Sequence, residues 1–384
     1  MVRHNCVYCD LMSNLVAQEP TDLRGTISVL ASHVIHSLGA DAVDVLIFDA
    51  PAQRLVNAGG RGFRGNGMEN AILRLEDTPA GKAVANNEIV RVSNISRSKN
   101  DFARLTDLAT EDMVAYVAVP LVAKKQVTGV LELWSRGQID ANAEWFNALE
   151  EITEKGVIAL THVMLVRRLQ RSKVDFAQAY DATIDAWSDA LELREYETKG
   201  HTQRVTDMAV DFARILGLEE AELVNVRRGA RLNDLGMLAI PERIELKTET
   251  LTEEELVIIR RHPMIGYEQL ASVELLKPAL DILRYHHEKW DGTGYPYGLG
   301  GLEIPLTARL FALVDVWDSL RSDRPFRKGW PEESVKAHVY ERAGKHFDPD
   351  LAGKFLKSLE SAKRKQIESE RVVHRGYDTE SFGT

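Results

Sequence analysis

Imidazole and carboxylate side chains are concentrated in the second half of the sequence, at positions where they could hold metal ions. Glu197 and His201 stand four residues apart, so they share one face of a helix. Asp315 lies in a strongly apolar stretch, and burying a carboxylate there costs several kcal/mol unless a partner such as a metal compensates it. The full set of candidate ligands is Glu197, His201, Asp234, His262, His286, His287 and Asp315.

The chemistry open to this set follows from its donor atoms. It offers nitrogen and oxygen but no cysteine sulfur, which favours iron, manganese, zinc or nickel over calcium. Two such ions bridged by an aspartate could clamp a phosphodiester for in-line attack by water. Each histidine alone is more often a structural or surface residue than a ligand, so the prediction depends on the whole set.

The elements that must position these residues are helices. From Glu195 onward the sequence has no alternating strand pattern. Thr252 with Glu255 is typical of a capping box at the start of a helix. The second half is therefore predicted to be an all-α domain, with helices over 204–216, 219–232, 252–261, 265–270, 278–287 and 306–320.

The first half has a mixed pattern. Apolar residues at three- and four-residue steps predict a helix that begins near Thr21 and stops at Gly39. Short apolar runs predict strands, two of which form a hairpin around a polar turn. This order indicates an α+β domain. The predicted strands cover 44–49, 88–93, 115–122 and 127–134, with the turn at 124–126.

A long helical stretch, from about residue 143 to residue 193, joins the two halves. Apolar residues at alternating three- and four-residue steps favour a coiled-coil seam, and hence a homodimer through this linker helix. The alternative is a helix that packs on its own domain. The expected seam residues are Leu149, Ile152, Gly156, Ala159, Val163 and Val166.

The composition and charge of the chain make some classes of function less favourable than others. The chain has 384 residues and a net charge of −10, which disfavours a nucleic-acid polymer as partner. We find no run of about 18 apolar residues and no signal-peptide pattern, so we expect no membrane span and a cytoplasmic location. Cys6 and Cys9, the two cysteines, lie near His4. One such pair is half a zinc site, so we interpret them as surface cysteines, with a site completed by a partner chain as the alternative.

The second half resembles the HD-GYP family over roughly residues 180 to 360. The resemblance rests on an ordered series of motifs: His286 to Pro296, Gly298-Leu299, Ile304-Pro305, Ala308-Arg309, Asp315, Asp323 to Arg327 and Gly344 to Pro349. Members of this family are cyclic di-GMP phosphodiesterases, and some hydrolyse cyclic GMP-AMP.

The resemblance implies roles for individual residues. The candidate ligands named above fall on metal-ligand positions, with Asp234 and Asp315 as the catalytic carboxylates. The position of Glu197 is associated with members that hold a third metal, so two or three divalent transition-metal ions are implied, with iron or manganese the first choice. Tyr295, Arg324 and Arg327 fall where the family contacts the dinucleotide, through an aromatic face and guanidinium forks.

The sequence departs from the family at two positions. The family's His-Asp pair is followed three residues later by lysine, but here Asn233 replaces the histidine and Met237 replaces the lysine. An amide oxygen is a weaker ligand for a transition metal than imidazole. Losing even an outer partner of a metal ligand typically costs about 10–100-fold in affinity or activity.

The first half resembles a GAF domain over residues 88 to 136, most closely at Val119 to Val122 and Thr128 to Leu133. Such domains bind small molecules or only dimerise. The sequence specifies no sensor ligand, and an empty dimerisation module is the alternative.

Together these observations predict metal-dependent hydrolysis of a cyclic dinucleotide, with cyclic di-GMP as the first choice, under control of a sensor domain. The departures at Asn233 and Met237 keep open a degenerate receptor that binds the dinucleotide without cleaving it, and a scaffold with structural metals is a third hypothesis. The expected organisation is a tail over 1–20, a GAF-like domain over 21–145, a linker helix over 146–193, an HD-GYP-like domain over 194–361 and a charged tail over 362–384.

Overall fold

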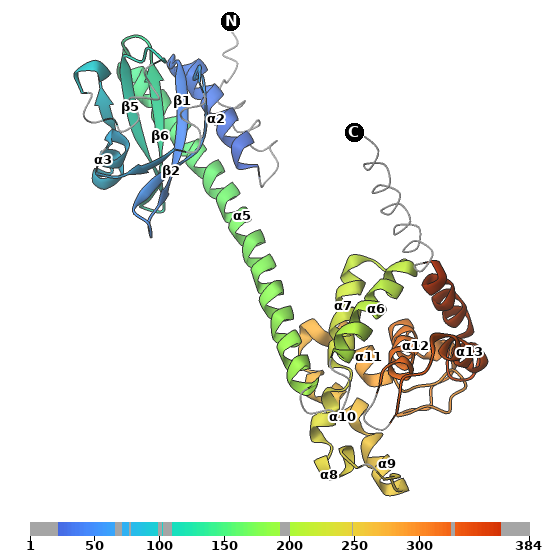
Figure 1. The fold of residues 1–384 in the computed structure, drawn as a ribbon. Helices are drawn as coiled ribbons and strands as arrows, with labels where there is room; N and C mark the ends of the chain where they lie inside the picture. Colours follow the sequence, from blue (N-terminus) through green and yellow to red (C-terminus); the bar gives the residue numbers. More distant parts are fainter. Residues whose placement is uncertain are drawn as a thin grey trace, which may run out of the picture. The chain divides into compact units, whose positions relative to one another are not determined.

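The structure, a computed structural model, describes residues 22–65, 71–76, 78–98, 102, 110–192, 200–247, 249–323 and 327–361. The chain divides into two compact units, Met1–Asp175 and Phe176–Thr384 (Figure 1). Cys6 and Cys9 lie outside the described residues. Within those residues, no helix has both the length and the apolar composition required to cross a bilayer.

The first unit is built on a six-stranded antiparallel sheet with the order β3-β2-β1-β6-β5-β4. The predicted hairpin is confirmed, because Ala123 pairs with Gln126 across a two-residue loop. Lys124 and Lys125 in this loop have φ of 49° and 65°, as a tight hairpin turn requires. The strands are β1 Ala42–Asp49, β2 Arg54–Arg61, β3 Ile72–Arg74, β4 Val90–Val92, β5 Ala115–Ala123 and β6 Gln126–Ser135.

Strand β2 was not among the predicted strands. Its sequence includes Asn57, Gly59 and Gly60, which have low strand propensity. Gly60 pairs with Asp44 of β1, and a Cβ atom at this glycine would lie 2.6 Å from the Asp44 Cβ. The close approach of β1 therefore requires a glycine at position 60. The same glycine lowers the strand propensity of β2, which is why the sequence pattern did not predict this strand.

Helix α2 (Leu23–Leu38) and the first turns of α5 (Ala143–Glu192) share a core with the sheet (Figure 1). Asp22 caps the start of α2 by accepting a hydrogen bond from the Gly25 amide at 2.8 Å, and Gly39 ends it at a φ of 66°, as predicted. Leu149 and Ile152 of α5 are fully buried in this core. The first residues of the expected coiled-coil seam thus pack on their own domain.

A second core contains the other face of the sheet and α3 (Pro79–Asn86). It includes the buried aromatic rings of Tyr116 and Trp134, whose centroids lie 4.5 Å apart. Two carboxylates are buried beside them: Trp134 Nε1 donates to Asp44 at 2.9 Å, and the Tyr116 hydroxyl donates to Glu132 at 2.6 Å. Each aromatic polar atom thereby gains the partner that its burial requires.

The described residues of the second unit form helices and isolated β-bridges, which confirms the all-α prediction. Helix α10 begins at His262, earlier than predicted, because Pro263 is favourable in the first turn of a helix. The capping box at Thr252 and Glu255 is present. The helices are α6 His201–Ile215, α7 Glu220–Leu232, α8 Glu242–Glu245, α9 Glu253–Ile259, α10 His262–Leu270, α11 Leu280–Tyr285, α12 Leu306–Arg321, α13 Glu332–Arg342 and a last helix over 349–361, with 3₁₀ turns η3 Leu235–Ala239, η4 Glu274–Ala279 and η5 Gly301–Glu303.

Helix α12 provides much of the core of this unit. Its apolar residues from Leu310 to Trp317 are almost all buried, so the helix is surrounded by other elements over most of its circumference. Trp317 packs edge-on against Phe355 at 5.5 Å between centroids, and Phe355 in turn contacts Phe212 of α6 at 5.1 Å. The helix itself is therefore held firmly in the core, and with it the backbone that carries Asp315.

We predict that the stability of this unit falls on mild acidification because of His346. Burial, with the charges of Lys289 and Arg342 adding to it, lowers the pKa of His346 from 6.5 to about 4. Between these values the unfolded chain takes up a proton that the folded chain does not, so stability is present above pH 6.5 and is lost as the pH falls towards 4. In urea unfolding of the metal-free protein at pH 7 and pH 4.5, His346→Gln should lose about 1–3 kcal/mol less on acidification than the unmodified chain. Equal losses would contradict this account.

Candidate metal centre

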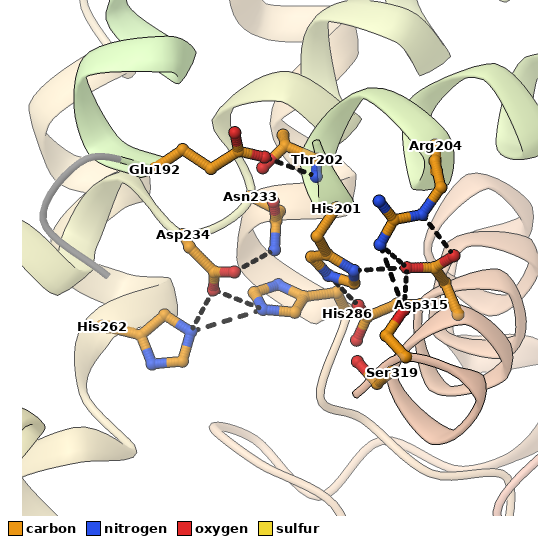
Figure 2. Close-up of polar contacts among 12 residues, drawn as sticks. Glu192, His201, Thr202, Arg204, Asn233, Asp234, His262, His286, Asp315 and Ser319 are labelled. Atoms are coloured by element: carbon orange, nitrogen blue, oxygen red, sulfur yellow. Dashed lines mark hydrogen bonds and ion pairs between the residues drawn. The ribbon is translucent and has the colours of Figure 1, made fainter. Parts of the chain in front are cut away.

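Four of the predicted ligands converge at the ends of helices, and Figure 2 shows three of them, Asp234, His262 and His286. Asp234 follows the end of α7, His262 is the first residue of α10, and His286 with His287 follows α11. One potential ligand atom of each lies within 4.8 Å of those of the others. Three segments that are distant in the sequence thus meet at one point.

The nearest donor atoms point directly at one another. Asp234 Oδ1 lies 3.3 Å from His262 Nε2 and 3.6 Å from His286 Nε2. The two Nε2 atoms are themselves 3.3 Å apart. Both rings are fully enclosed, whereas the Asp234 side chain keeps about a third of its surface exposed.

The backbone fixes which ring nitrogen can bind a cation. His262 Nδ1 donates to the Ile259 carbonyl at 2.8 Å, and His286 Nδ1 donates to the Ile282 carbonyl at 3.0 Å. Both Nε2 atoms therefore carry lone pairs that face each other inside the protein, which is unfavourable without a positive charge between them. The donor set fits a divalent transition metal, and carbonyl bonds to Nδ1 are typical of metal-binding histidines.

The close packing of these ionisable groups shifts their pKa values. Burial alone would raise the pKa of Asp234, but the adjacent imidazoles of His262 and His286, when protonated, outweigh it and hold the pKa well below its ordinary value. Burial alone would lower the pKa of His286, yet the neighbouring Asp234 carboxylate raises it. Burial and the adjacent imidazoles lower the pKa of His287 far below its ordinary value. His287 is therefore a neutral potential ligand at pH 7.

A second pair of predicted ligands lies beside this cluster (Figure 2). His201 Nε2 is 3.3 Å from Asp315 Oδ1, and His201 Nδ1 donates to Asp318 at 2.7 Å. The side chain of Asp315 is 25% exposed and that of Asp318 only 9%, so the more deeply buried carboxylate of α12 is Asp318, and Asp315 faces the site. Together they give His201 the same arrangement of one anchored and one presented nitrogen.

Asp318 was not among the predicted site residues. Arg204 of α6 donates to both of its oxygens, at 3.0 and 2.8 Å. Burial would raise the pKa of Asp318, but the bonds from His201 and Arg204 lower it strongly. The three-residue spacing between Asp315 and Asp318 on one helix face was the available sequence signal.

Asn233, which replaces the family's histidine, is buried at the end of α7. Its amide Nδ2 donates to Asp234 Oδ2 at 2.6 Å. It therefore orients the Asp234 carboxylate, a candidate ligand, through the oxygen that does not face the histidines. Met237 lies half-buried on η3 and brings no charge to the site.

The predicted substrate-contacting residues have different surroundings. The Tyr295 ring stacks on His287, with centroids 4.7 Å apart. Arg327 donates to the backbone carbonyls of Ser319 and Leu320 at the end of α12, at 2.8 and 3.2 Å. Glu197 and Arg324 lie outside the described residues.

Glu288, which was not among the predicted site residues, shapes the loop that presents Tyr295. The buried Glu288 carboxylate accepts hydrogen bonds from the Tyr297 and Leu299 amides, at 2.8 and 3.0 Å. Gly294 is required there, because a Cβ atom would lie 2.4 Å from the Lys289 nitrogen. The Gly-Tyr-Pro turn is thus a rigid support for the ring.

We predict that Asp318→Asn weakens metal binding without unfolding the domain. The amide no longer provides a charged acceptor for His201 Nδ1, so the ring loses its fixed orientation. Loss of such an outer partner should lower Mn²⁺ affinity about 10–100-fold, measured by equilibrium dialysis. The control is Asp211→Asn, an exposed acid of α6 that pairs with Arg214. Equal affinity in Asp318→Asn and the unmodified chain would contradict the role given to Asp318.

Two protein-family models match separate parts of the chain. The GAF domain family matches residues 22–154, and the HD domain family matches residues 185–351. The cluster of histidines and aspartates lies entirely within the second match.

Curated relatives share the second match. The chain is 38% identical over 196 residues, half of its length, to the cyclic di-GMP phosphodiesterase response regulator RpfG of Xanthomonas campestris, and covers 52% of it. It is 31% identical over 70% of its length to a cyclic di-GMP phosphodiesterase of Vibrio cholerae, and covers 61% of it. It is 34% identical over 46% of its length to the 3'3'-cGAMP-specific phosphodiesterase 2 of the same species, and covers 34% of that protein.

The chain thus spans about half the length of the curated relatives it matches, and up to 61% in the case of the Vibrio cholerae cyclic di-GMP phosphodiesterase. The motifs, the domain matches and the geometry of the site lead to one assignment. The chain contains a region that matches the GAF domain family and a region that matches the HD domain family, and the second region carries the motifs that resemble the HD-GYP family.

Proposed function

We propose that this chain hydrolyses a phosphodiester bond of a cyclic dinucleotide, with cyclic di-GMP as the first choice, in a metal-dependent reaction. The observation that carries the proposal is the convergence of Asp234, His262, His286 and His287, in which the Nε2 atoms of His262 and His286 face each other. Divalent ions at such a site polarise a phosphoryl oxygen and activate water. Relatives named for cyclic di-GMP and cyclic GMP-AMP hydrolysis supply the substrate class.

The donor atoms favour particular ions. Imidazole with carboxylate and no thiolate suits iron or manganese. Asp234 with its three histidines forms one group of donors, and His201 with Asp315 forms a neighbouring pair. We therefore propose two ions, with a third only if Glu197 joins the site.

Among the proposed substrate contacts, Tyr295 lies against His287. Tyr295 offers a rigid aromatic face and a hydroxyl group, and burial raises its pKa, so the hydroxyl stays protonated and can donate. The Arg260 guanidinium lies 5.8 Å from the centre of the same ring. A cation thus lies near this ring although the lysine expected at position 237 is methionine. Arg324 and Arg327 remain candidate phosphate contacts.

A second candidate function is a receptor that binds the dinucleotide and does not cleave it. The observation that favours it is the Asn233 amide, which donates to Asp234 where the family has a ligand histidine. The site would then lack one donor for a second ion. Tyr295 and the candidate arginines would still bind the ligand.

One assay separates the two functions. We expect the unmodified chain, supplied with Mn²⁺ or with Fe²⁺ under anaerobic conditions, to convert cyclic di-GMP slowly to linear pGpG, detected by liquid chromatography. Asn233→His with Met237→Lys should raise turnover about 10–100-fold, because a ligand and a cation are restored. Asp234→Asn is the inactive control.

The outcomes differ clearly. Binding of cyclic di-GMP without turnover, together with turnover in the double variant, would establish the receptor. No turnover and no binding of cyclic di-GMP or cyclic GMP-AMP by any variant would overturn both functions.

We also propose that the chain is a homodimer through α5, by a stripe other than the one first expected. Ile158, Leu165, Leu169 and Phe176 are each more than half exposed. Their separations of seven, four and seven residues place them on the a and d positions of a heptad. A second copy of the same helix is the partner that matches this repeat.

This dimer is tested by sedimentation of the full chain. Leu165→Glu with Leu169→Glu should raise the dimer dissociation constant at least tenfold, since burying each leucine contributes about 1.5–3 kcal/mol. Arg167→Gln, at a heptad position facing away from the stripe, should leave it unchanged. A monomeric unmodified chain would refute the proposal.

A further inference from the structure

We infer that Glu192 and Arg231 are positioning residues through which the end of α5 sets the geometry of the metal ligands. This inference rests on the proposed metal centre and extends it to regulation. The part of α5 from Phe176 onward belongs to the second unit. Its contacts reach the two helices whose ends carry His201 and Asp234.

The first contact is a ladder of acids along one face of α5. Asp181, Asp185 and Asp189 follow one another at four-residue steps, so they lie one above the other on the helix. Asp181 pairs with Arg228 Nε at 2.7 Å. Asp185 pairs with Arg231 Nε at 3.0 Å, and Asp189 lies 3.7 Å from Arg231 Nη1. Both arginines belong to α7.

Arg231 is the critical member of this ladder because its side chain is only 7% exposed. A buried guanidinium deprived of its carboxylates is strongly unfavourable, so the rotation of α7 must keep Arg231 against α5. Arg231 also donates to Gln203 of α6. One side chain thus ties α5, α6 and α7 together.

The metal ligands follow directly after this point on α7. Leu232, next to Arg231, packs in one small core with Ile184 of α5. Asn233 and Asp234 come next, so Asp234 lies within one helical turn of the buried arginine. A rotation of α5 that displaces Arg231 would move Asp234 relative to His262 and His286.

The second contact is at the start of α6. Helix α6 begins at His201, and its cap residue Gly200 has no side chain to accept from the first amides. Glu192, the last residue of α5, does so instead: it accepts from the Gly200 amide at 3.1 Å and from the Thr202 amide at 3.0 Å (Figure 2). A carboxylate at this end is also favoured by the helix dipole. His201 lies between the two bonded amides.

Through both contacts, the end of α5 can influence the positions of the metal ligands. The same continuous helix contributes Leu149 and Ile152 to the core of the first unit. A change in the rotation of α5 therefore alters two ligand-bearing segments together, without contact between α5 and a metal ion. Because α5 would act by changing the positions of the metal ligands, disrupting its contacts should change the affinity for metal ions.

The test measures Mn²⁺ binding to the full chain by electron paramagnetic resonance of the free ion. Glu192→Ala should lower the affinity about tenfold or more, the scale expected for an outer partner of a ligand. Glu192→Gln, which keeps one acceptor oxygen, should fall between it and the unmodified chain. Asp175→Asn, an exposed acid earlier on α5, is the matched control and should bind as the unmodified chain does.

A second variant guards against misfolding. Asp185→Asn with Asp189→Asn removes the charges that hold Arg231 but keeps the shape of α5, and it should weaken Mn²⁺ binding like Glu192→Ala. Helical circular dichroism of each metal-free variant must match that of the control. Unchanged affinity in Glu192→Ala and in the double variant would overturn the inference, whereas an unmodified chain that binds no Mn²⁺ would instead refute the proposed metal centre.

Discussion

Two imidazole nitrogens that face each other at 3.3 Å, with an ionised carboxylate beside them, form the constraint on which the helical unit depends. Such an arrangement is stable only with positive charge between the donors. The protein maintains it by hydrogen bonds from each Nδ1 to a backbone carbonyl, so that the helices themselves hold the lone pairs in place. The positions at which α10 begins and α11 ends therefore determine where these two nitrogens lie.

The sequence was sufficient to predict which side chains cluster at the candidate site, but not the residues that support them. Asp234, His262, His286 and His287 could be found because their types and order form a recognisable series. Asp318, Glu288 and Arg231 could not, since an acid or an arginine on a helix is usually solvated, and only the packing of one element on another reveals a buried partner. The roles of these three residues depend on contacts between elements that are distant in the sequence.

The same distinction applies to the fold. The hairpin β5–β6 and the helices of the second unit were predicted because their periodic patterns are long. Strand β2 was missed because it contains glycines, which have low strand propensity but allow β1 to lie close to it. On α5 two apolar stripes compete, and the sequence alone cannot tell which one a sheet covers: Leu149 and Ile152 are buried in the core, whereas Leu165 and Leu169 are exposed.

The ligands of the candidate centre come from several helices, from His201 at the start of α6 to Asp315 in the middle of α12, so the centre exists only when most of this unit is folded. An ion bound at a hundred times its dissociation constant would add about 2.7 kcal/mol to folding, a large share of the marginal stability of an ordinary domain. A chain deprived of its ions would spend more time unfolded and exposed to proteases. The cell's supply of transition metal would then determine how much of this protein persists, as well as how fast it works.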